Sequence, residues 1–421
     1  MEAVTEDRDL FTQGYEQAVK LLNACCTEDG FLASPTANDN YRRIWARDGV
    51  IIGLAGLLSN YHDLANGLKL TLETLARHQG IHGEIPSNVD PISGRVSYGG
   101  TTGRVDADLW FIIGCGEYWQ ATRDDDFLER VLPAIEKVRF LLGAWEFNGR
   151  GLLYVPQAGD WADEYLHTGY VLYDQLLYLQ AQQTISYLHA QVHGSSDHVL
   201  IERLSRLRHL IRANYWFEKD QCEIGDRYHE VLYAKGCEAA KSRMENFNYW
   251  LPSFSPTGYS YRFDAFANIL ASLFNIADDD QRHCVDEYIE AHVRPELPVL
   301  PAFQPVIKPL DQDWQELQMT FSYTFKNKPH EFHNGGLWPM LSGFYVADLA
   351  SRDQQDRARY YLEAIHRANQ LEMNEQPWSF PEYVHGKLLT AGGTFRQGWS
   401  AAAAIIGHHA LQGDKVFHVE A

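Results

Sequence analysis

The chain of 421 residues carries a formal net charge of −20 at pH 7, with 45% hydrophobic and 13% aromatic residues. A charge of that sign and size argues against nucleic acid and anionic membranes as partners, because both repel an acidic surface. The apolar content is sufficient for a large core, and the length suits either two average domains or one large helical toroid.

The cysteines and the N-terminal residues favour a cytoplasmic location. Six cysteines are scattered without a CxxC pair, which is typical of reduced thiols rather than a disulfide framework. The acidic segment Met1–Asp7 lacks the apolar stretch of a secretory signal. The longest apolar run, 50–58, is about half of what a membrane span needs. We therefore expect a soluble, cytoplasmic protein.

Apolar residues recur at helical spacing along the whole chain. The pattern predicts twelve helices, over 9–27, 47–58, 61–79, 105–122, 124–142, 169–190, 195–215, 263–276, 278–291, 336–350, 353–371 and 395–411. Strand-like pattern is limited to a short hairpin expected near 149–156 and irregular pieces near 222–260. No linker rich in Pro, Gly or Ser divides the sequence, so we expect a single domain over residues 1–421.

The connections between these helices alternate in length. Each even-numbered helix joins the next through a very short turn, as at Ser59–Tyr61, whereas each odd-numbered helix leads into a long loop. Short turns force antiparallel neighbours, so twelve helices make six hairpins that can close into an all-α (α/α)6 barrel. An open α-solenoid is the alternative, but it would show a repeat of roughly 34–47 residues, and the sequence shows none.

All the long loops then open at one end of the barrel, where residues distant in sequence can meet over one ligand. Polar and aromatic side chains suited to sugar hydroxyls and sugar faces gather there. The residues we expect to bind substrate are Tyr41, Trp45, Arg47, Asp48, Asp106, Asp160, Trp161, His333, Trp338, Gln397 and Trp399. Structural roles are the alternative, since Arg47 and Asp48 can form an ion pair at a helix start. Asp106 and Asp160 can cap helices, and the aromatic residues can pack in the core.

Two of these loops set a carboxylate among aromatic rings: Gly159–Asp163 contains Asp163, and Trp378–Tyr383 contains Glu382. Hydrolysis of a glycosidic bond needs such a pair, because one carboxyl group protonates the leaving oxygen while the other activates water. Aromatic faces also stack on sugar rings and keep water from the acid. We interpret Asp163 as the general acid and Glu382 as the general base. A first-turn helix carboxylate and a charged turn residue are the structural alternatives.

Other chemistries find little support in the sequence. It contains no HExxH, no P-loop, no GxSxG and no GxGxxG that opens a helix after a strand. His408 and His409 are adjacent and therefore point to different faces of a helix, which disfavours a metal pair. No metal and no organic cofactor is expected, since glycoside hydrolysis of this kind needs neither.

The C-terminal third resembles the neutral/alkaline invertases, a family of (α/α)6-barrel glycoside hydrolases. His333–Pro339 is similar to their HNGGSWP motif, with Leu337 where serine is usual. Trp378–Lys387 resembles their W-PEYYDGK motif, which supplies the general base, with one added residue and His385 in place of aspartate. Gln397–Ser400 is similar to the QTWS element that follows.

The N-terminal half resembles two related families. Ile44–Asp48 matches the (I/F)WxRD element that binds the sugar whose bond is cut. Arg104–Phe111 lies between the VDSGLWW of invertases and the VDASLWF of the sugar-releasing domain of glycogen debranching enzymes. Trp161–Asp163 looks more like the WMD of debranching enzymes than the MIDRRMG of invertases. The resemblance implies an inverting mechanism in which Asp163 and Glu382 lie on either side of a water, with carboxyl groups roughly 6.5–9.5 Å apart.

The resemblance implies that the substrate is a small α-glucoside. Sucrose, cleaved to glucose and fructose, is the first choice, because the chain lacks the N-terminal β-domains and the transferase half of a debranching enzyme. The alternative is a debranching-like α-1,6-glucosidase acting on short oligosaccharides, or on a glucosylated small solute. The loops near 222–260 and 291–332 are the expected specificity elements.

Two rival classes fit the same kind of cleft. A sugar 2-epimerase would move a proton with histidines at the mouth. The histidines considered for that role are His82, His330, His333 and His385. A sugar-binding protein would keep the cleft without turnover, although binding alone needs no acid and base on opposite faces. Helical toroids commonly expose flat faces that can pair, so a homo-oligomer is a further hypothesis.

Overall fold

The structure is a computed structural model that describes residues 3–36, 40–195, 198–217, 227–244, 248–320 and 324–419. Helices dominate it. They are α1 (Ala3–Cys25), α2 (Ala46–Leu58), α3 (His62–Arg77), α4 (Val105–Thr122), α5 (Asp125–Trp145), α6 (Leu172–His193), α7 (His198–Tyr215), α8 (Glu230–Arg243), α9 (Ala265–Leu273), α10 (Asp279–His292), α11 (Trp314–Gln318), α12 (Pro339–Ser351), α13 (Gln355–Gln370) and α14 (Gly398–Ala410). Every predicted helix is confirmed, with shifted ends, and α8 and α11 are additional.

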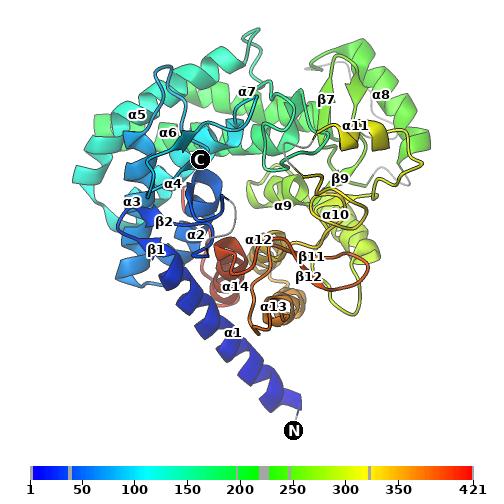
Figure 1. The fold of residues 1–421 in the computed structure, drawn as a ribbon. Coiled ribbons are helices and arrows are strands. Elements are labelled where there is room, and N and C mark those ends of the chain that lie inside the picture. Colours follow the sequence, from blue (N-terminus) through cyan, green and yellow to red (C-terminus); the bar gives the residue numbers. More distant parts are fainter. Residues whose placement is uncertain are drawn as a thin grey trace.

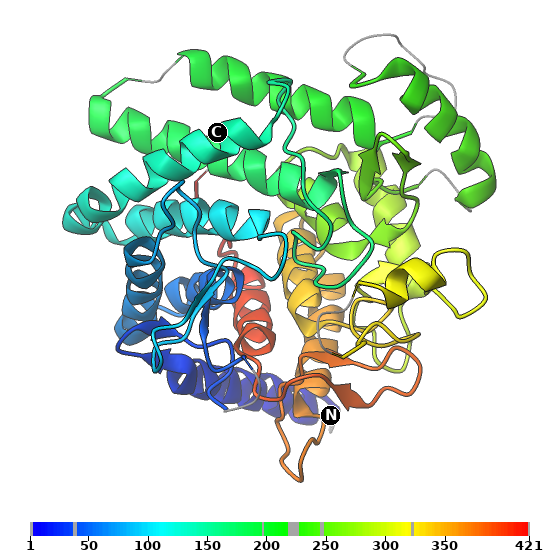
Figure 2. The same cartoon turned by 45° about the horizontal axis from the view of Figure 1, so that its top comes forward.

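Six of these helices form a closed inner ring (Figures 1 and 2). Helix α2 contacts α4, which contacts α6, which contacts α9; α12 joins α9 to α14, and α14 returns to α2. Outside this ring, α3, α5, α7 and α13 each pack on the inner helix that precedes them, and α1 packs on α14. The alternation of short and long connections therefore predicted the (α/α)6 architecture correctly.

The inner helices are buried on all sides because other helices surround them. On α4, every residue from Val105 to Trp119 is buried, whereas outer helices such as α3 bury only one apolar stripe. Small residues let neighbouring inner helices approach closely. A Cβ atom on Gly343 of α12 would lie 2.6 Å from the Cα atom of Ala403 on α14, so only glycine fits that crossing.

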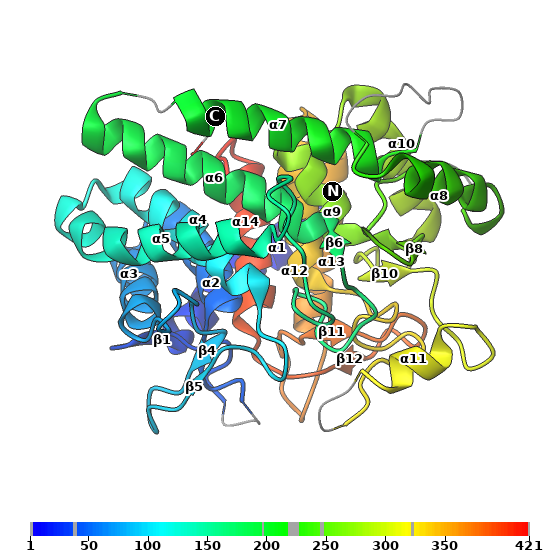
Figure 3. The ribbon, with the colours of Figure 1, turned by 90° about the horizontal axis from the view of Figure 1, so that it is seen from above.

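Short strands form small sheets within the long loops. They are β1 (Cys26–Thr27), β2 (Gly30–Phe31), β3 (Ile44–Trp45), β4 (Asn88–Val89), β5 (Val96–Ser97), β6 (Tyr170–Val171), β7 (Ser253–Ser255), β8 (Gly258–Tyr259), β9 (Phe263–Asp264), β10 (Phe303–Gln304), β11 (Tyr383–Val384) and β12 (Ala391–Gly392). The antiparallel sheet β3–β4–β5 and the hairpin β11–β12 lie on the same side of the helices as α11 (Figure 3). These pieces therefore gather at one end of the barrel.

Two local predictions need correction. The hairpin predicted near 149–156 is wrong, because this segment is irregular and Val155 makes a single antiparallel bridge to Gly169 instead. The described part of 222–260 contains α8 and the β7–β8 hairpin rather than only irregular chain. The buried side of α8 consists of Tyr233, Gly236 and Ala240, and two of these are too small to give a strong periodic signal.

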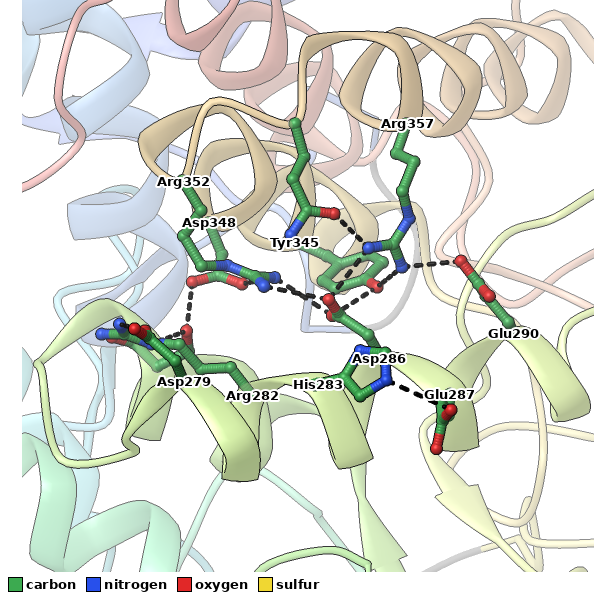
Figure 4. Close-up of polar contacts among 12 residues, drawn as sticks. Asp279, Arg282, His283, Asp286, Glu287, Glu290, Tyr345, Asp348, Arg352 and Arg357 are labelled. Atoms are coloured by element: carbon green, nitrogen blue, oxygen red, sulfur yellow. Dashed lines mark hydrogen bonds and ion pairs between the residues drawn. The ribbon is translucent and has the colours of Figure 1, made fainter.

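A buried ion-pair cluster ties α10, α12 and α13 together (Figure 4). Asp286 of α10 accepts hydrogen bonds from Arg352 at 2.9 and 3.0 Å, from Arg357 at 2.9 Å and from the Tyr345 hydroxyl at 2.8 Å. Arg352 also pairs with Asp348 at 2.7 Å. Burial alone would raise the pKa of Asp286, but the two arginines hold it below its ordinary value.

We expect Asp286→Asn to lower the free energy of unfolding by about 2 kcal/mol, because it removes the carboxylate that two partly buried guanidinium groups share. Asp279→Asn is the matched control on the same helix, since the Asp279 side chain is 96% exposed. Urea unfolding followed by circular dichroism measures both variants. The control should leave the midpoint unchanged, and an equal loss in both variants would contradict a specific role for the cluster.

Candidate active site

The loops at the strand-bearing end of the barrel enclose a cavity of about 730 Å³. This volume lies within the usual range of small-molecule sites. Most of the site residues predicted from the sequence line this cavity. They are Tyr41, Trp45, Arg47, Asp48, Trp161, Asp163, His333, Trp338, Glu382 and Trp399. The lining comes from the long loops that precede α2, α4, α6, α12 and α14, so the convergence of distant segments follows from the ring.

A packed cluster of aromatic rings supports the floor of the cavity. His333 stacks on Trp338 with ring centroids 4.9 Å apart and planes at 14°, while Trp161 and Trp399 meet Trp338 edge-on at 5.8 and 5.5 Å. The indole nitrogen of Trp338 donates to the Phe332 carbonyl at 3.0 Å, which holds the ring in place. These four rings are buried, whereas Trp45 is a lining tryptophan that is partly exposed and can stack on a sugar ring.

Among the four histidines considered for epimerase chemistry, only His333 lines the cavity. Burial lowers the pKa of His333 well below its ordinary value, and the charge of Arg47 acts in the same direction, so the imidazole is neutral. Its Nδ1 atom has no hydrogen-bond partner within the described part of the chain. A single neutral histidine can therefore offer a hydrogen bond to a sugar hydroxyl.

Glu382 is buried and held at both oxygens. Its Oε1 accepts a hydrogen bond from the Tyr41 hydroxyl at 2.7 Å, and its Oε2 accepts one from the Thr394 N–H at 3.0 Å. Gly393 passes so close that an added Cβ would lie 2.4 Å from Oε2, at a φ of +72° that also favours glycine. Burial raises the pKa of Glu382, and the Lys326 ammonium is the largest influence that opposes this rise.

Removing the Lys326 charge is expected to move the acidic limb of the kcat/KM profile to higher pH. Without the ammonium group the pKa of Glu382 rises further, so the carboxylate forms only at higher pH and activity at low pH falls. The measurement is the pH dependence of kcat/KM for Lys326→Met. Lys326→Arg is the matched control, because it keeps the charge and should keep the parent profile. An unshifted limb in the Met variant would contradict this coupling.

Asp163 faces two guanidinium groups rather than only aromatic rings. Its Oδ1 lies 3.0 Å from Arg104 Nη2 and 4.0 Å from Arg47 Nη2, and its side chain is 25% exposed. That aromatic residues shield Asp163 from water stays a prediction. Asp163 lines the cavity beside Arg104 and Arg47.

Arg47 organises the carboxylates on this side of the cavity. It donates to Asp106 Oδ2 at 2.7 Å, its Nε lies 3.9 Å from Asp48 Oδ2, and its guanidinium lies 5.7 Å from the Trp399 ring centroid. Burial raises the pKa of Asp48 to about 7, even though Arg47 opposes that rise. Asp48 therefore changes charge near neutral pH while it lines the cavity.

Three selected residues lie behind the cavity wall and do not line it: Asp106, Asp160 and Gln397. Asp106 accepts the Arg47 bond described above, which fixes that guanidinium from behind. Asp160 accepts from the Ala162 N–H at 3.0 Å and contacts His167 Nδ1 at 2.9 Å, which anchors the Asp163 loop.

The third of them, Gln397, is buried beside Trp399. In the amide orientation that satisfies both ends, Gln397 donates to the Ala33 carbonyl at 2.8 Å and accepts from Trp399 Nε1 at 3.2 Å. This places Gln397 as a support for a lining tryptophan. Asp106, Asp160 and Gln397 therefore hold cavity-lining residues in place and do not face the ligand themselves.

Two departures from the invertase motifs, Leu337 and His385, lie away from the cavity lining. Leu337 is 2% exposed and packs in a small cluster with Val299 and Val384. His385 Nδ1 accepts from the N–H groups of Lys387 and Leu388 at 3.1 and 3.2 Å, which are the turn contacts an aspartate side chain makes. Both departures therefore preserve local structure.

Several lining residues were not predicted from the sequence, and four of them carry a positive charge. They are Arg43, Arg95, Arg104 and Lys326. Arg104 directly precedes the VDSGLWW-like motif, and this position could have predicted that it lines the cavity. Lys326 lies in the loop 291–332, which the sequence marks as a specificity element without showing which of its side chains face a ligand.

The described residues contain no group of three or more His, Cys, Asp or Glu side chains that could hold a metal ion. Over the same residues, no helix is long and apolar enough to cross a membrane.

The ring of paired helices is an (α/α)6 barrel, the fold of several solved glycoside hydrolases. The fold is similar to that of a bacterial glucoamylase complexed with acarbose, with a TM-score of 0.66 at 16% identity over 96% of this chain and 56% of that one. It is also similar to a GH63 mannosylglycerate hydrolase from Thermus thermophilus, with a TM-score of 0.61 at 13% identity over 93% of this chain and 99% of that one.

The chain belongs to the alkaline and neutral invertase family, which it matches over residues 29–413. A curated relative is the chloroplastic alkaline/neutral invertase E of Arabidopsis thaliana, 24% identical over 91% of this chain and 68% of the relative. The names of such relatives include chloroplastic, mitochondrial and cytosolic forms.

Proposed function

We propose that this protein hydrolyses sucrose to glucose and fructose with inversion at the anomeric carbon of glucose. The observation that carries the proposal is that Asp163 and Glu382, far apart in sequence, line one cavity together with four tryptophans. Membership of the invertase family supports sucrose as the substrate, because the relatives are named invertases.

Glu382 acts as the general base on a water molecule. Its two oxygens are held by Tyr41 and Thr394, so the carboxylate is oriented before the substrate arrives. As the water attacks the anomeric carbon, one of its protons passes to Glu382. Asp163 gives its proton to the glycosidic oxygen, which leaves with fructose, and the attack from the opposite face yields β-glucose.

Arg47 and Asp48 bind the glucose unit. A carboxylate can accept hydrogen bonds from two neighbouring hydroxyls, and the adjacent guanidinium favours the ionised form that does so. Both residues line the cavity beside Trp399, whose ring packs against the Arg47 guanidinium and helps to hold it in place. This arrangement supports a site for one pyranose ring between the acid and the base.

Proton NMR of the reaction with sucrose tests the proposal, with isomaltose and maltose as comparators. β-Glucose as the first anomer, with sucrose cleaved fastest, is the expected result. α-Glucose as the first anomer, in a time course faster than mutarotation, would contradict inversion at glucose. Faster cleavage of isomaltose would favour the debranching-like alternative instead.

A cytoplasmic location and a homo-oligomeric state stay predictions. The cysteines that the structure describes are free thiols, which supports a reducing compartment. Size-exclusion chromatography with light scattering measures the oligomeric state directly.

A further inference from the structure

One wall of the cavity is a face of the sheet β3–β4–β5, which lies with the other mouth elements in Figure 3. Trp45 pairs with Asn88 and Asn88 pairs with Ser97, so these three residues form a row across the strands. Side chains alternate between the two faces of a strand, so Arg43 and Arg95, each two positions from this row, belong to the same face. All five residues line the cavity.

The two arginines of this wall form no ion pair with a carboxylate among the described residues. Arg43 donates to the neutral amide oxygen of Asn88 at 3.1 Å, and Arg95 lines the cavity with its side chain exposed. Asp90 lies between them in the sheet register, with its N–H bonded to the Arg95 carbonyl. The Asp90 side chain accepts from the N–H groups of residues 92 and 93 and from the Ser93 hydroxyl, and the Arg43 charge acts on it without a direct ion pair.

The other arginines of the cavity are paired with acids. Arg47 contacts Asp106 at 2.7 Å, and Arg104 contacts Asp163 at 3.0 Å. In a chain with a net charge of −20, acidic partners are abundant. Two cations left without an ion-pair partner at a ligand-facing wall therefore point to a negative charge that arrives with the ligand.

The wall lies toward the proposed general acid. Gly99, two residues beyond Ser97, packs so closely on Arg104 that an added Cβ would lie 2.4 Å from the Arg104 Cγ atom. Arg104 in turn holds Asp163. A continuous path of contacts thus leads from β5 to the carboxyl group that would protonate the leaving oxygen. A group bound along this wall belongs to the leaving half of the substrate.

We infer that Arg43 and Arg95, with Asn88 and Ser97, bind a carboxylate or phosphate carried by the leaving group of the substrate. This rests on the proposed function, because it assumes glycoside hydrolysis with Asp163 as the acid. Guanidinium groups suit planar and tetrahedral oxyanions, and the amide and hydroxyl of the same row supply neutral hydrogen bonds. The preferred substrate class is then an α-glucoside with an anionic aglycone, with sucrose as its neutral analogue.

Two matched substrate pairs test this inference. Glucosylglycerate and glucosylglycerol differ by a carboxylate, and sucrose carrying a 6-phosphate on fructose differs from sucrose by a phosphate. We expect at least one anionic partner to have a kcat/KM at least about tenfold higher than its neutral twin. Raising NaCl from about 50 mM to about 500 mM should reduce that preference in the parent protein, because salt screens exposed charges. The pair that shows the larger ratio of kcat/KM values identifies whether the enzyme prefers a carboxylate or a phosphate.

The double variant Arg43→Gln/Arg95→Gln should remove most of the preference for the anionic substrate. Arg42→Gln is the matched control, since Arg42 is exposed, adjacent to Arg43 and not among the residues that line the cavity. It removes the same kind of charge and should keep the parent ratio. A thermal melt of each variant establishes that it folds, and the salt dependence of the parent tests the inference without any substitution.

The outcomes separate this inference from the proposed function. Sucrose hydrolysis with no preference in either pair, or a preference that Arg42→Gln removes equally, overturns the inference and leaves the proposed function standing. Hydrolysis of an anionic substrate without hydrolysis of sucrose supports the inference and overturns the sucrose assignment. Hydrolysis of none of the four substrates overturns both.

Discussion

Glu382→Gln is expected to lower kcat for sucrose at least about 10³-fold, with KM changed much less. The amide keeps the size of the side chain and can still accept a hydrogen bond from Tyr41, but it cannot take a proton from water. Because every turnover includes this proton transfer, kcat for α-glucosyl fluoride should fall to the same extent as kcat for sucrose. Initial rates of glucose release measure both substrates.

Glu331→Gln is the control for that experiment. Glu331 lies in the loop that precedes α12, does not line the cavity and pairs with Lys328 at 4.0 Å, so its loss should leave kcat near the parent value. A Glu382→Gln enzyme with more than about a tenth of the parent kcat would exclude Glu382 as the base. An isomerised sugar without hydrolysis would instead support epimerase chemistry.

Asp163→Asn should lower the rate on sucrose much more than the rate on α-glucosyl fluoride, whereas Glu382→Gln should lower both rates equally. Sucrose needs its leaving oxygen protonated, so we expect kcat for sucrose to fall about 10³-fold. Fluoride leaves without a proton, so the rate with α-glucosyl fluoride should stay within about tenfold of the parent. Parallel kinetics on the two substrates give the ratio that identifies a general acid.

Glu164→Gln provides the neighbouring comparison, because Glu164 also lines the cavity and follows Asp163 in the chain. Its loss should affect the two substrates alike, since only a proton donor discriminates between them. Equal losses on both substrates for Asp163→Asn would assign Asp163 to sugar binding, and the acid would then have to be sought among the other carboxylates at the mouth.

The fold could be predicted from local features of the sequence because outer helices such as α3 carry an apolar periodicity and inner helices such as α4 are apolar nearly all round. The turn at Ser59–Tyr61 and others like it are too short to allow anything except antiparallel neighbours, so the hairpins follow. Helix α8 was not predicted, because its buried residues Gly236 and Ala240 are too small to produce a clear apolar periodicity. The hairpin predicted over 149–156 was wrong because Val155 pairs with Gly169, which lies outside that segment.

The site could be predicted at the level of loops but not at the level of individual orientations. Trp338 and Trp399 line the cavity as expected, whereas Asp106 stands on the first turn of α4 with its carboxylate behind Arg47. Only the packing of α4 against its neighbours decides that direction. Arg43 and Arg95 were missed because their common face depends on strand pairing between segments about 50 residues apart, which no local pattern reveals.

Closure of the inner ring has a consequence for the synthesis of this protein. Helix α2 meets α14, so the first and last hairpins complete the circle, and Arg47 lies against Trp399 only when both are present. A ribosome makes the chain from the N-terminus, and contacts between its two ends are the last to become available. A nascent chain can therefore stack its early helices, but it gains a working mouth only after the residues of α14 have emerged.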